Sequence, residues 1–371
     1  MNTIDFRRHL HRHPELSFEE HETARFIREA LTAEGIAHRP IATTGTLAVI
    51  RGAKTTPATE RRAVILRADI DALPIEEQTA LAYASCHSGV MHACGHDMHA
   101  ATLYGALLKL HENPDFAGTV FGLFQPGEEC NPGGASIVLE EHPFEGYEIL
   151  ACIGEHVDWQ LEVGEVGLCA GAFMAASDEL RFTVHGVGGH GAMRPLLKDP
   201  VQAAAALITR LLALNGEDEV LSIGKVEAAG ATNVIPDEVY LEGTLRTFDE
   251  SRRRALHAEI ARLTTENDAQ HATSTRFDLS HGYPAVKNDP TLTELLQTHC
   301  TAEGLAFRTL DRRMTAEDFG FYTLHYPSLF YRLGVGAEAG KSHTATFLPK
   351  EEAMKIGERM MQRMALHILN K

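Results

Sequence analysis

Four short apolar runs stand out in the first part of the chain. They lie at residues 46–50, 63–69, 119–125 and 148–154, and they are rich in branched and aromatic side chains. Most of their apolar residues are consecutive and do not alternate with polar ones, which is typical of strands that are buried on both faces. The pattern therefore predicts a mostly parallel sheet.

Helical patterns lie around and between these runs. In residues 17–35 apolar side chains recur at helical spacing, and Gly35 is a typical helix end. Ser17 and Glu20 have the spacing of a capping box, which predicts that the helix begins there. Residues 99–113, between two of the predicted strands, also have a helical apolar stripe. Strands that alternate with helices indicate an α/β fold.

The middle of the chain, about residues 178–283, changes character. Its pattern predicts a strand, a helix, two strands, a helix and a strand, which is the βαββαβ order of a ferredoxin-like α+β unit. From about residue 290 the pattern returns to helices and one buried run. We therefore predict a discontinuous α/β domain of residues 1–175 and 287–371, interrupted by an inserted domain of residues 176–286.

The composition is that of a folded, acidic protein. Of the 371 residues, 44% are hydrophobic and 23% are charged, and 51 acidic residues against 34 lysines and arginines give a formal net charge of −17. Such a charge repels phosphate backbones and anionic lipid surfaces, so we expect no nucleic-acid partner. No apolar segment has the length of a signal peptide or a membrane span, so we expect a cytoplasmic protein with no membrane partner.

Metal-ligating side chains are concentrated in MHACGHDMHA, residues 91–100. Other such residues follow the predicted strands, and ligands in open parallel sheets collect beyond the carboxyl ends of the strands. The residues expected to meet there are Asp69, Asp71, Cys94, His96, Glu128, Glu129, His156 and His343. Nitrogen, oxygen and sulfur donors together favour zinc, manganese, nickel or cobalt over calcium or magnesium.

Several motifs, in the same order, are similar to those of a known enzyme family. They are LHRHPELSFEE, RADIDALPIEE, MHACGHDMHAA, LFQPGEE, GEHV, GGHGAM, NVIPDEVYLEGTLRTF, MTAEDFG and SHTATF, and they extend over nearly the whole chain. The chain resembles the amidohydrolase branch of the aminoacylase and carboxypeptidase metallopeptidases, which contains hippurate hydrolases, indole-acetyl-amino-acid hydrolases and N-acetyldiaminopimelate deacetylases. The resemblance implies a di-metal catalytic domain and an inserted lid or dimerisation domain.

The resemblance also implies two divalent metal ions per chain and roles for the residues near them. Cys94 is expected to bridge both ions as a thiolate, and the other protein ligands are expected to be His96, Glu129, His156 and His343. Glu128 is expected to be the general base, which takes a proton from water and passes it to the leaving nitrogen. The alternatives are a cysteine that is only a small buried residue and an acidic pair that is solvated surface.

Asp69 and Asp71 are interpreted as carboxylates near the metal site that orient histidines, with turn capping as the alternative. His99 lies three residues from His96 on the predicted helix, and the resemblance does not make it a ligand. Because metal loss would leave a thiolate exposed in a cleft, we also expect Cys94 to be the thiol most sensitive to oxidation.

Three residues of the inserted domain, His190, Asn233 and Arg246, resemble positions that contact the substrate. Arg246 offers two parallel donors to a carboxylate. The resemblance implies a homodimer in which His190, with Asn233 beside it, reaches into the partner's metal site. The alternative is a monomer in which His190 only shapes a glycine turn. Arg194 and Pro195 stand where relatives have proline and histidine, which sets this chain apart near the substrate.

These features predict an enzyme that hydrolyses the amide bond of a small molecule, an N-acyl amino acid or a very short peptide. N-acetyl-amino-acid deacetylases and aminoacylases catalyse this reaction. The alternative is a non-catalytic protein that binds a small molecule or a metal on the same fold. A closed structural metal site normally has four ligands and no free base beside them, so the pairing of Glu128 with Glu129 favours catalysis.

Overall fold

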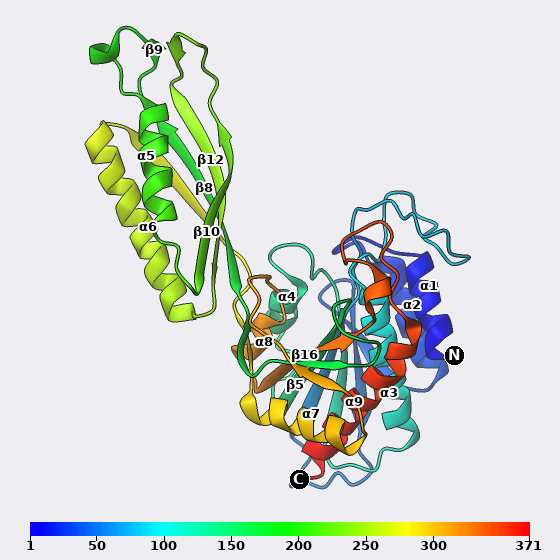
Figure 1. Ribbon diagram of the computed structural model, residues 1–371. Coiled ribbons are helices and arrows are strands. Elements are labelled where there is room, and N and C mark those ends of the chain that lie inside the picture. Colours follow the sequence, from blue (N-terminus) through cyan, green and yellow to red (C-terminus); the bar gives the residue numbers. More distant parts are fainter. The chain divides into compact units, whose positions relative to one another are not determined.

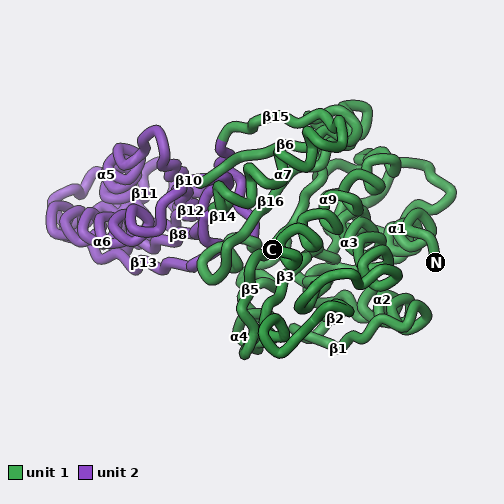
Figure 2. The backbone as a smooth tube through the Cα atoms, turned by 90° about the horizontal axis from the view of Figure 1, so that it is seen from below, with its two compact units in different colours: residues 1–171, 287–311, 318–371 green, residues 172–286, 312–317 purple.

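The structure, a computed structural model, describes all 371 residues. The chain divides into two compact units, which are coloured separately in Figure 2. Unit 1 comprises Met1–Gly171, Lys287–Asp311 and Asp318–Lys371, and unit 2 comprises Ala172–Val286 and Arg312–Glu317. Unit 2 is thus inserted into the sequence of unit 1. Its role as a lid or dimerisation domain stays a prediction.

Unit 1 is built on an eight-stranded sheet. Its strands are β1 (Ala37–Ile41), β2 (Gly45–Arg51), β3 (Arg62–Asp69), β4 (Thr119–Gln125), β5 (Glu148–Asp158), β6 (Val166–Leu168), β15 (Phe307–Thr309) and β16 (Ser328–Gly334). The sheet order is β1-β2-β4-β3-β5-β16-β6-β15, and β4, β3, β5 and β16 pair in parallel. Each of the four apolar runs forms a strand, and the predicted α/β class is confirmed. The carboxyl ends of the four parallel strands meet at one edge.

Helices surround this sheet (Figure 1); most of them contact a strand, whereas α1 packs on α3. They are α1 (Thr3–Arg12), α2 (His21–Ala33), α3 (His96–Glu112), α4 (Gly134–Glu140), α7 (Pro290–Ala302), α8 (Gly320–Thr323) and α9 (Met354–Leu369). α3 and α9 pack on β3 and β5, and Ile153 of β5 belongs to the core that they form. The next residue of β5, Gly154, faces the ring of Phe319 instead. Successive strand residues point to opposite faces, so both faces of β5 are covered. None of the helices combines the length and apolar character that crossing a membrane requires.

The capping box predicted for α2 is wrong. The N-cap is Glu20, and its side chain makes no cap hydrogen bond. Ser17 instead donates to Asp71 at 2.7 Å, and the buried Glu20 accepts from the Thr44 hydroxyl at 2.6 Å and from the Gly127 amide at 2.8 Å. Both side chains therefore connect the segment before α2 to loops that follow the sheet strands.

Unit 2 has the predicted βαββαβ order. Its elements are β8 (Ala176–His185), α5 (Pro200–Leu212), β10 (Glu219–Glu227), β12 (Glu238–Thr247), α6 (Glu250–His271) and β13 (Ser274–His281). The antiparallel sheet has the order β10-β12-β8-β13, and α5 and α6 pack against it around a separate core. β9 (Gly189–His190) pairs with β11 (Val234–Ile235) as a short ribbon at one end of the unit, visible in Figure 1. The remaining elements are β7 (Gly171–Met174), β14 (Val286–Asn288) and 3-10 turns at Arg194–Leu196, Ala337–Ala339 and Glu351–Ala353.

A buried ionic network ties α1 to the start of α3. Asp97, in the first turn of α3, accepts from Nε of Arg7 at 2.8 Å and lies 2.9 Å from Nδ1 of His11. The other ring nitrogen of His11 lies 3.2 Å from Glu77. Burial alone would lower the pKa of His11, but hydrogen bonds to the two carboxylates raise it to about 9. His11 is therefore a buried imidazolium at neutral pH that holds the two helices together.

We expect His11 to make the stability of the protein depend on pH. Its pKa is about 9 in the folded chain against an ordinary 6.5, so its stabilisation is complete below the ordinary value and is lost as the pH rises through the folded value. The loss in free energy of unfolding should be about 3 kcal/mol. Urea unfolding at about pH 6 and about pH 9.5 should show this loss in the wild type but not in His11→Gln. The exposed control His21→Gln should behave as the wild type, and an undiminished pH dependence in His11→Gln would contradict the assignment.

Candidate metal centre

Cys94, Gly95 and His96 form the turn that opens α3. Gly95 is the N-cap, with a φ of 100°, in the left-handed region that glycine adopts without strain. The turn places Cys94 beside His156 of β5 and His96 beside Asp71, which follows β3. Asp71, which follows β3, and His156 of β5 therefore both lie beside the N-terminal end of α3.

The five predicted metal ligands bring their donor atoms together. The Sγ of Cys94 lies 3.2 Å from Nε2 of His156 and 3.3 Å from Nε2 of His343. Oε1 of Glu129 lies 3.4 Å from Nε2 of His343 and 3.9 Å from Nε2 of His96. Cys94 belongs to two sets of three donors that each lie within 4.8 Å, one with His96 and His156 and the other with Glu129 and His343. One thiol shared by two donor sets suits a bridged pair of metal ions.

The hydrogen bonds of the histidines leave Nε2 directed at the cluster. Nδ1 of His156 donates to the carbonyl of Val157 at 2.7 Å, and Nδ1 of His96 lies 3.1 Å from Oδ1 of Asp71. Nε2 of His96 is buried without a hydrogen-bond partner, and so is Oε1 of Glu129. A buried polar atom without a partner is costly, and a metal ion bound to these atoms would remove that cost. The donor set therefore fits divalent metal ions.

Asp69 and Asp71, both fully buried, organise the residues around the donors. Asp71 orients His96 with one oxygen and accepts from the backbone amide of Glu129 at 2.9 Å with the other. Asp69 lies 2.6 Å from Nδ1 of His99. These contacts go beyond the capping of a turn, since each carboxylate holds a histidine ring in place.

His99 lies next to the cluster, but both of its ring nitrogens are occupied. Nδ1 contacts Asp69, and Nε2 accepts from the backbone amide of Val157 at 2.9 Å. No lone pair is left for a metal ion. His99 instead links the end of β3 to β5.

Arg67 and Asp318 are two charged residues near this site that the sequence reasoning missed. Nη1 of Arg67 donates to Asp69 and Nη2 donates to Asp318, both at 2.6 Å, and Nε donates to Gln125 at 2.9 Å. All four residues are buried. The signal in the sequence is an arginine inside an apolar strand, because a buried guanidinium requires carboxylate partners.

Neighbouring charges set the protonation of the site. Burial alone would raise the pKa of Asp69, but His96 and Arg67 hold it well below its usual value. Burial opposes the protonation of His96, yet Asp69 raises its pKa well above the usual value, so metal binding at His96 must release a proton. Burial lowers the pKa of His156 well below its usual value, which keeps that ring in the neutral form that binds metals.

The metal-free chain does not expose the Cys94 thiolate on which the expectation of oxidation sensitivity rests. Cys94 is only 6% exposed, and burial, followed by the Glu129 carboxylate, raises its pKa to about 12. The thiolate is the reactive form, and almost none of it forms at neutral pH. Cys86 and Cys130 are the exposed free cysteines and are therefore more accessible to oxidants.

Glu128 lies in the turn after β4, directly before Glu129. Its Oε2 is 4.0 Å from Nε2 of His96, and the residue is only 7% exposed. The alternative interpretation of the acidic pair as solvated surface is therefore wrong. The turn directs both carboxylates to the same cluster.

His343 reaches the cluster from the loop after β16. Its φ of 61° is left-handed, which is uncommon for a residue other than glycine. Its backbone N–H donates to the carbonyl of Ala93 at 2.8 Å, and this bond ties the loop to the segment that contains Cys94. Strained backbone of this kind is concentrated at functional sites.

The substrate-contacting residues predicted in unit 2 do not come together within one chain. His190 pairs with Val234, and the amide of Gly191 donates to the carbonyl of Asn233 at 2.8 Å, so His190 and Asn233 share the β9–β11 ribbon. Arg246 lies near the other end of β12, the end at which the chain enters β8. From the ribbon end of β12 to Arg246 the strand extends roughly 26 Å, at about 3.3 Å per residue.

Comparisons with known proteins test the family resemblance. Residues 65–367 match the peptidase family M20/M25/M40. The chain is 38% identical over 360 residues to the N-acetyl-L-cysteine deacetylase of Bacillus subtilis, which covers 95% of this chain and 85% of that protein. It is 36% identical over 360 residues to the N-acetyldiaminopimelate deacetylase of Oceanobacillus iheyensis, which covers 95% of each.

Among solved structures, a dinuclear metal binding peptidase of the M20 family from Bacillus subtilis is similar along nearly its whole length. The TM-score is 0.87 at 33% sequence identity, and the match covers 99% of this chain and 97% of that chain. The resemblance inferred from the motifs is thus confirmed. This chain belongs to the peptidase family M20/M25/M40.

Proposed function

We propose that this chain hydrolyses the amide bond of N-acyl amino acids or very short peptides with metal-activated water. The observation that carries the proposal is the pair of donor sets that share the Cys94 thiol, with the Glu128 carboxylate beside them. The expected enzyme class, a hydrolase of amide bonds, is confirmed by the family and by relatives named as deacetylases and an N-acyl-L-amino acid amidohydrolase.

Five residues would hold the metal ions: Cys94, His96, Glu129, His156 and His343. Two bound ions, of zinc, manganese, nickel or cobalt, would supply Lewis acidity to the substrate carbonyl and lower the pKa of a water molecule. Glu128 would take the proton of the attacking water and deliver it to the leaving nitrogen. Asp71 contacts Nδ1 of His96, which leaves Nε2 as the nitrogen that would bind a metal ion.

The substrate class is small N-acyl amino acids, and the names of the relatives support it. Two of the similar proteins are named for N-acetyl substrates, N-acetyl-L-cysteine and N-acetyldiaminopimelate. The substrate carboxylate would pair with Arg246, whose guanidinium is half-buried on β12. A cytoplasmic location fits six cysteines that are all free.

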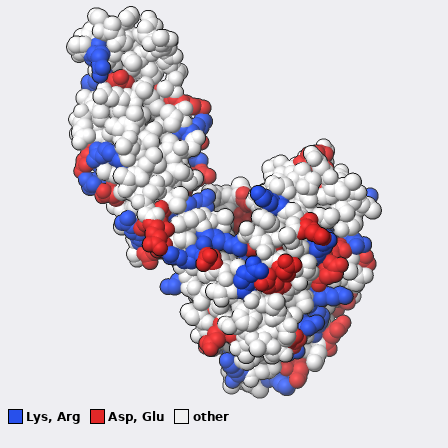
Figure 3. Space-filling model, in the orientation of Figure 1, with Lys and Arg blue, Asp and Glu red and all other residues white.

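The exposed ribbon of unit 2 favours a homodimer. Several large apolar side chains around His190 are exposed, namely Val187, Met193, Leu196 and Val234. On the face drawn in Figure 3, the end of the unit that carries β9 shows few charged side chains. Exposed apolar side chains next to one another are typical of a surface that a partner covers. β10 also leaves one edge of the sheet unpaired, which offers a route to edge-to-edge pairing.

The separation of His190 from Arg246 also supports a shared site. If both contact one substrate, they come from different chains, because within one chain His190 lies in the β9–β11 ribbon beyond one end of β12, whereas Arg246 lies near the other end of that strand. His190 of one protomer would then hydrogen-bond the oxyanion formed in the metal site of its partner. In this arrangement only the dimer contains a complete site.

Metal analysis tests the dinuclear centre. Full-length protein equilibrated with Mn²⁺ and freed of unbound ions should contain two ions per chain. His343→Ala should bind fewer, because His343 belongs to one donor set, whereas His21→Ala, at an exposed histidine of α2, should keep both. A ceiling of one ion per chain in the wild type would reject the bridged pair.

Substitutions of the acidic pair separate the base from the ligand. Glu128→Gln should retain both metal ions and the fold while lowering turnover by about 10² to 10⁴-fold, the usual contribution of a positioned general base. Glu129→Ala should lose metal, since its Oε1 is one of the clustered donor atoms. Turnover with an N-acetyl amino acid and elemental analysis are the two measurements. If the two phenotypes came out exchanged, the role assignment would be reversed.

Mixing inactive subunits tests the shared site. Glu128→Gln and His190→Ala homodimers should each be inactive, but after subunit exchange one of the two sites in a heterodimer has both intact residues. Turnover should then return to about a quarter of the wild-type level if half of the chains pair as heterodimers. Differently tagged subunits show that exchange has occurred. Exchange without recovered turnover would mean that His190 serves its own chain.

A further inference from the structure

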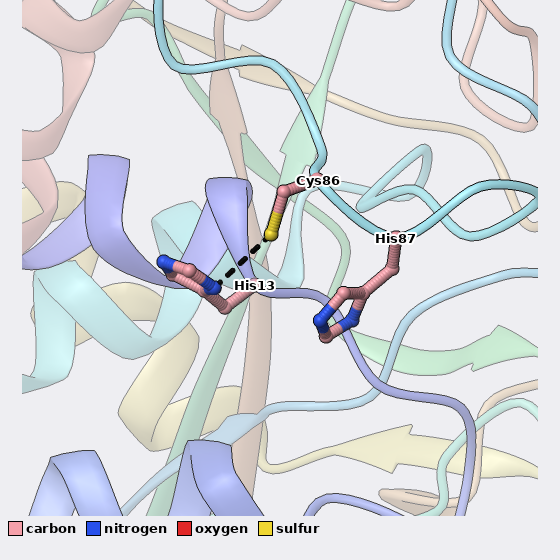
Figure 4. Close-up of side chains that lie close together, drawn as sticks. All are labelled: His13, Cys86 and His87. Carbon is pink, nitrogen blue, oxygen red and sulfur yellow. Dashed lines mark hydrogen bonds between the residues drawn. The ribbon is translucent and has the colours of Figure 1, made fainter.

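Three side chains outside the metal centre form a second group of possible metal ligands. They are His13, at the C-cap of α1, and Cys86 and His87, in the loop that precedes the MHACGHD motif. One ligand atom of each lies within 4.8 Å of the others. Figure 4 shows the three side chains close together, with the sulfur of Cys86 directed toward His13. We call them the outer cluster.

The distance between two of the ligand atoms in the outer cluster is close to that around a bound zinc ion. Sγ of Cys86 lies 3.2 Å from Nδ1 of His13. Around a tetrahedral zinc ion, with bonds of about 2.3 Å to sulfur and about 2.0 Å to nitrogen, neighbouring ligand atoms are separated by roughly 3.3 to 3.6 Å. The ligand atoms of all three residues lie within 4.8 Å of one another, so the ring of His87 would move closer to complete the set.

A hydrogen bond fixes the ring of His87 in a form that suits metal binding. Nδ1 of His87 lies 2.8 Å from the carbonyl oxygen of Pro14, so Nδ1 carries the proton and the lone pair is on Nε2. Metal-bound histidines usually donate their other N–H to a carbonyl or carboxylate in this way. Burial, followed by the nearby His87, lowers the pKa of His13, which favours the neutral form of that ring.

The backbone holds the three residues in place without a metal ion. The amide of Cys86 donates to the carbonyl of Arg12 at 2.9 Å, next to His13. The amide of Ser85 donates to Glu77 at 2.6 Å, and its hydroxyl donates to the carbonyl of His87 at 3.0 Å. Prior organisation of the ligands lowers the entropy lost on binding.

We propose that His13, Cys86 and His87 bind one zinc ion, or another thiophilic divalent ion, at a site separate from the donor sets of the metal centre. A thiolate and two imidazoles select zinc over the oxygen-preferring Mn²⁺ and Mg²⁺. Three protein ligands leave the fourth position to water. The bound ion joins the end of α1 to a loop 73 residues later in the sequence.

The test measures the reactivity of individual thiols, which does not depend on turnover. The full-length protein, loaded with Mn²⁺, is alkylated with N-ethylmaleimide in the presence of increasing Zn²⁺, and modified peptides are quantified by mass spectrometry. Zn²⁺ should slow alkylation of Cys86 at least about tenfold, because a coordinated thiolate is a poor nucleophile. Cys130, the other exposed cysteine, is the internal control and should react at an unchanged rate. Equal effects of Zn²⁺ on both thiols would overturn the proposal.

Substitution of His87 identifies the ligand. The side-chain amide of Asn reproduces the Nδ1 donor to Pro14 but has no equivalent of Nε2, so His87→Asn keeps the loop bond and removes the lone pair. It should raise the Zn²⁺ concentration needed for protection at least about tenfold, whereas His21→Asn should not. Elemental analysis after Zn²⁺ loading should give one ion fewer in Cys86→Ser than in the wild type. Unchanged protection in His87→Asn, or equal zinc content in Cys86→Ser, would contradict the assignment.

Discussion

The metal centre depends on two carboxylates buried at the end of β3. A buried charge requires partners. The partners of Asp69 and Asp71 come from β3 itself, from α3 and from the loop after β4. Asp71 accepts from the amide of Glu129 and orients His96, while Asp69 binds His99 and Arg67. The same contacts that satisfy the two carboxylates therefore fix a ligand ring, a ligand backbone and the start of α3. Loss of Asp69 would remove one carboxylate partner of Arg67, and loss of Asp71 would remove the nearest carboxylate of His96.

The parallel sheet explains why these groups meet at all. β4, β3, β5 and β16 end at one edge, so the residues that follow each strand are close in space although they are far apart in sequence. The helix that opens at the glycine turn brings a thiol and an imidazole to that edge. The ionic network of Arg7, His11 and Asp97 then holds the same helix against α1. The parallel sheet thus determines where the donor side chains lie, and the contacts of the buried charged residues determine how those side chains are oriented.

The sequence was informative where a local pattern or an ordered set of motifs determines the result. Continuous apolar runs predicted the strands, and the motif order predicted the donor cluster around Cys94. The spacing of Ser17 and Glu20 predicted a capping box that does not form. Ser17 instead donates to Asp71 in the loop after β3, and Glu20 accepts from Thr44 and Gly127. Asp318 could not be assigned, since its partner Arg67 lies 251 residues away. The burial that raises the pKa of Cys94 also requires the folded chain.

The protonation of the metal-free site explains how metal binding and the local charges are connected. Without ions, His96 is held as a cation by Asp69, and Cys94 keeps its proton because it is buried beside Glu129. Two divalent ions would replace both protons and balance the carboxylates that gather at the edge. The acidic groups that repel one another in an empty site would thus offset the charge of the bound ions in a loaded site. In the metal-free chain, the protons on His96 and Cys94 offset part of the negative charge of these side chains. Bound metal ions would take the place of those protons.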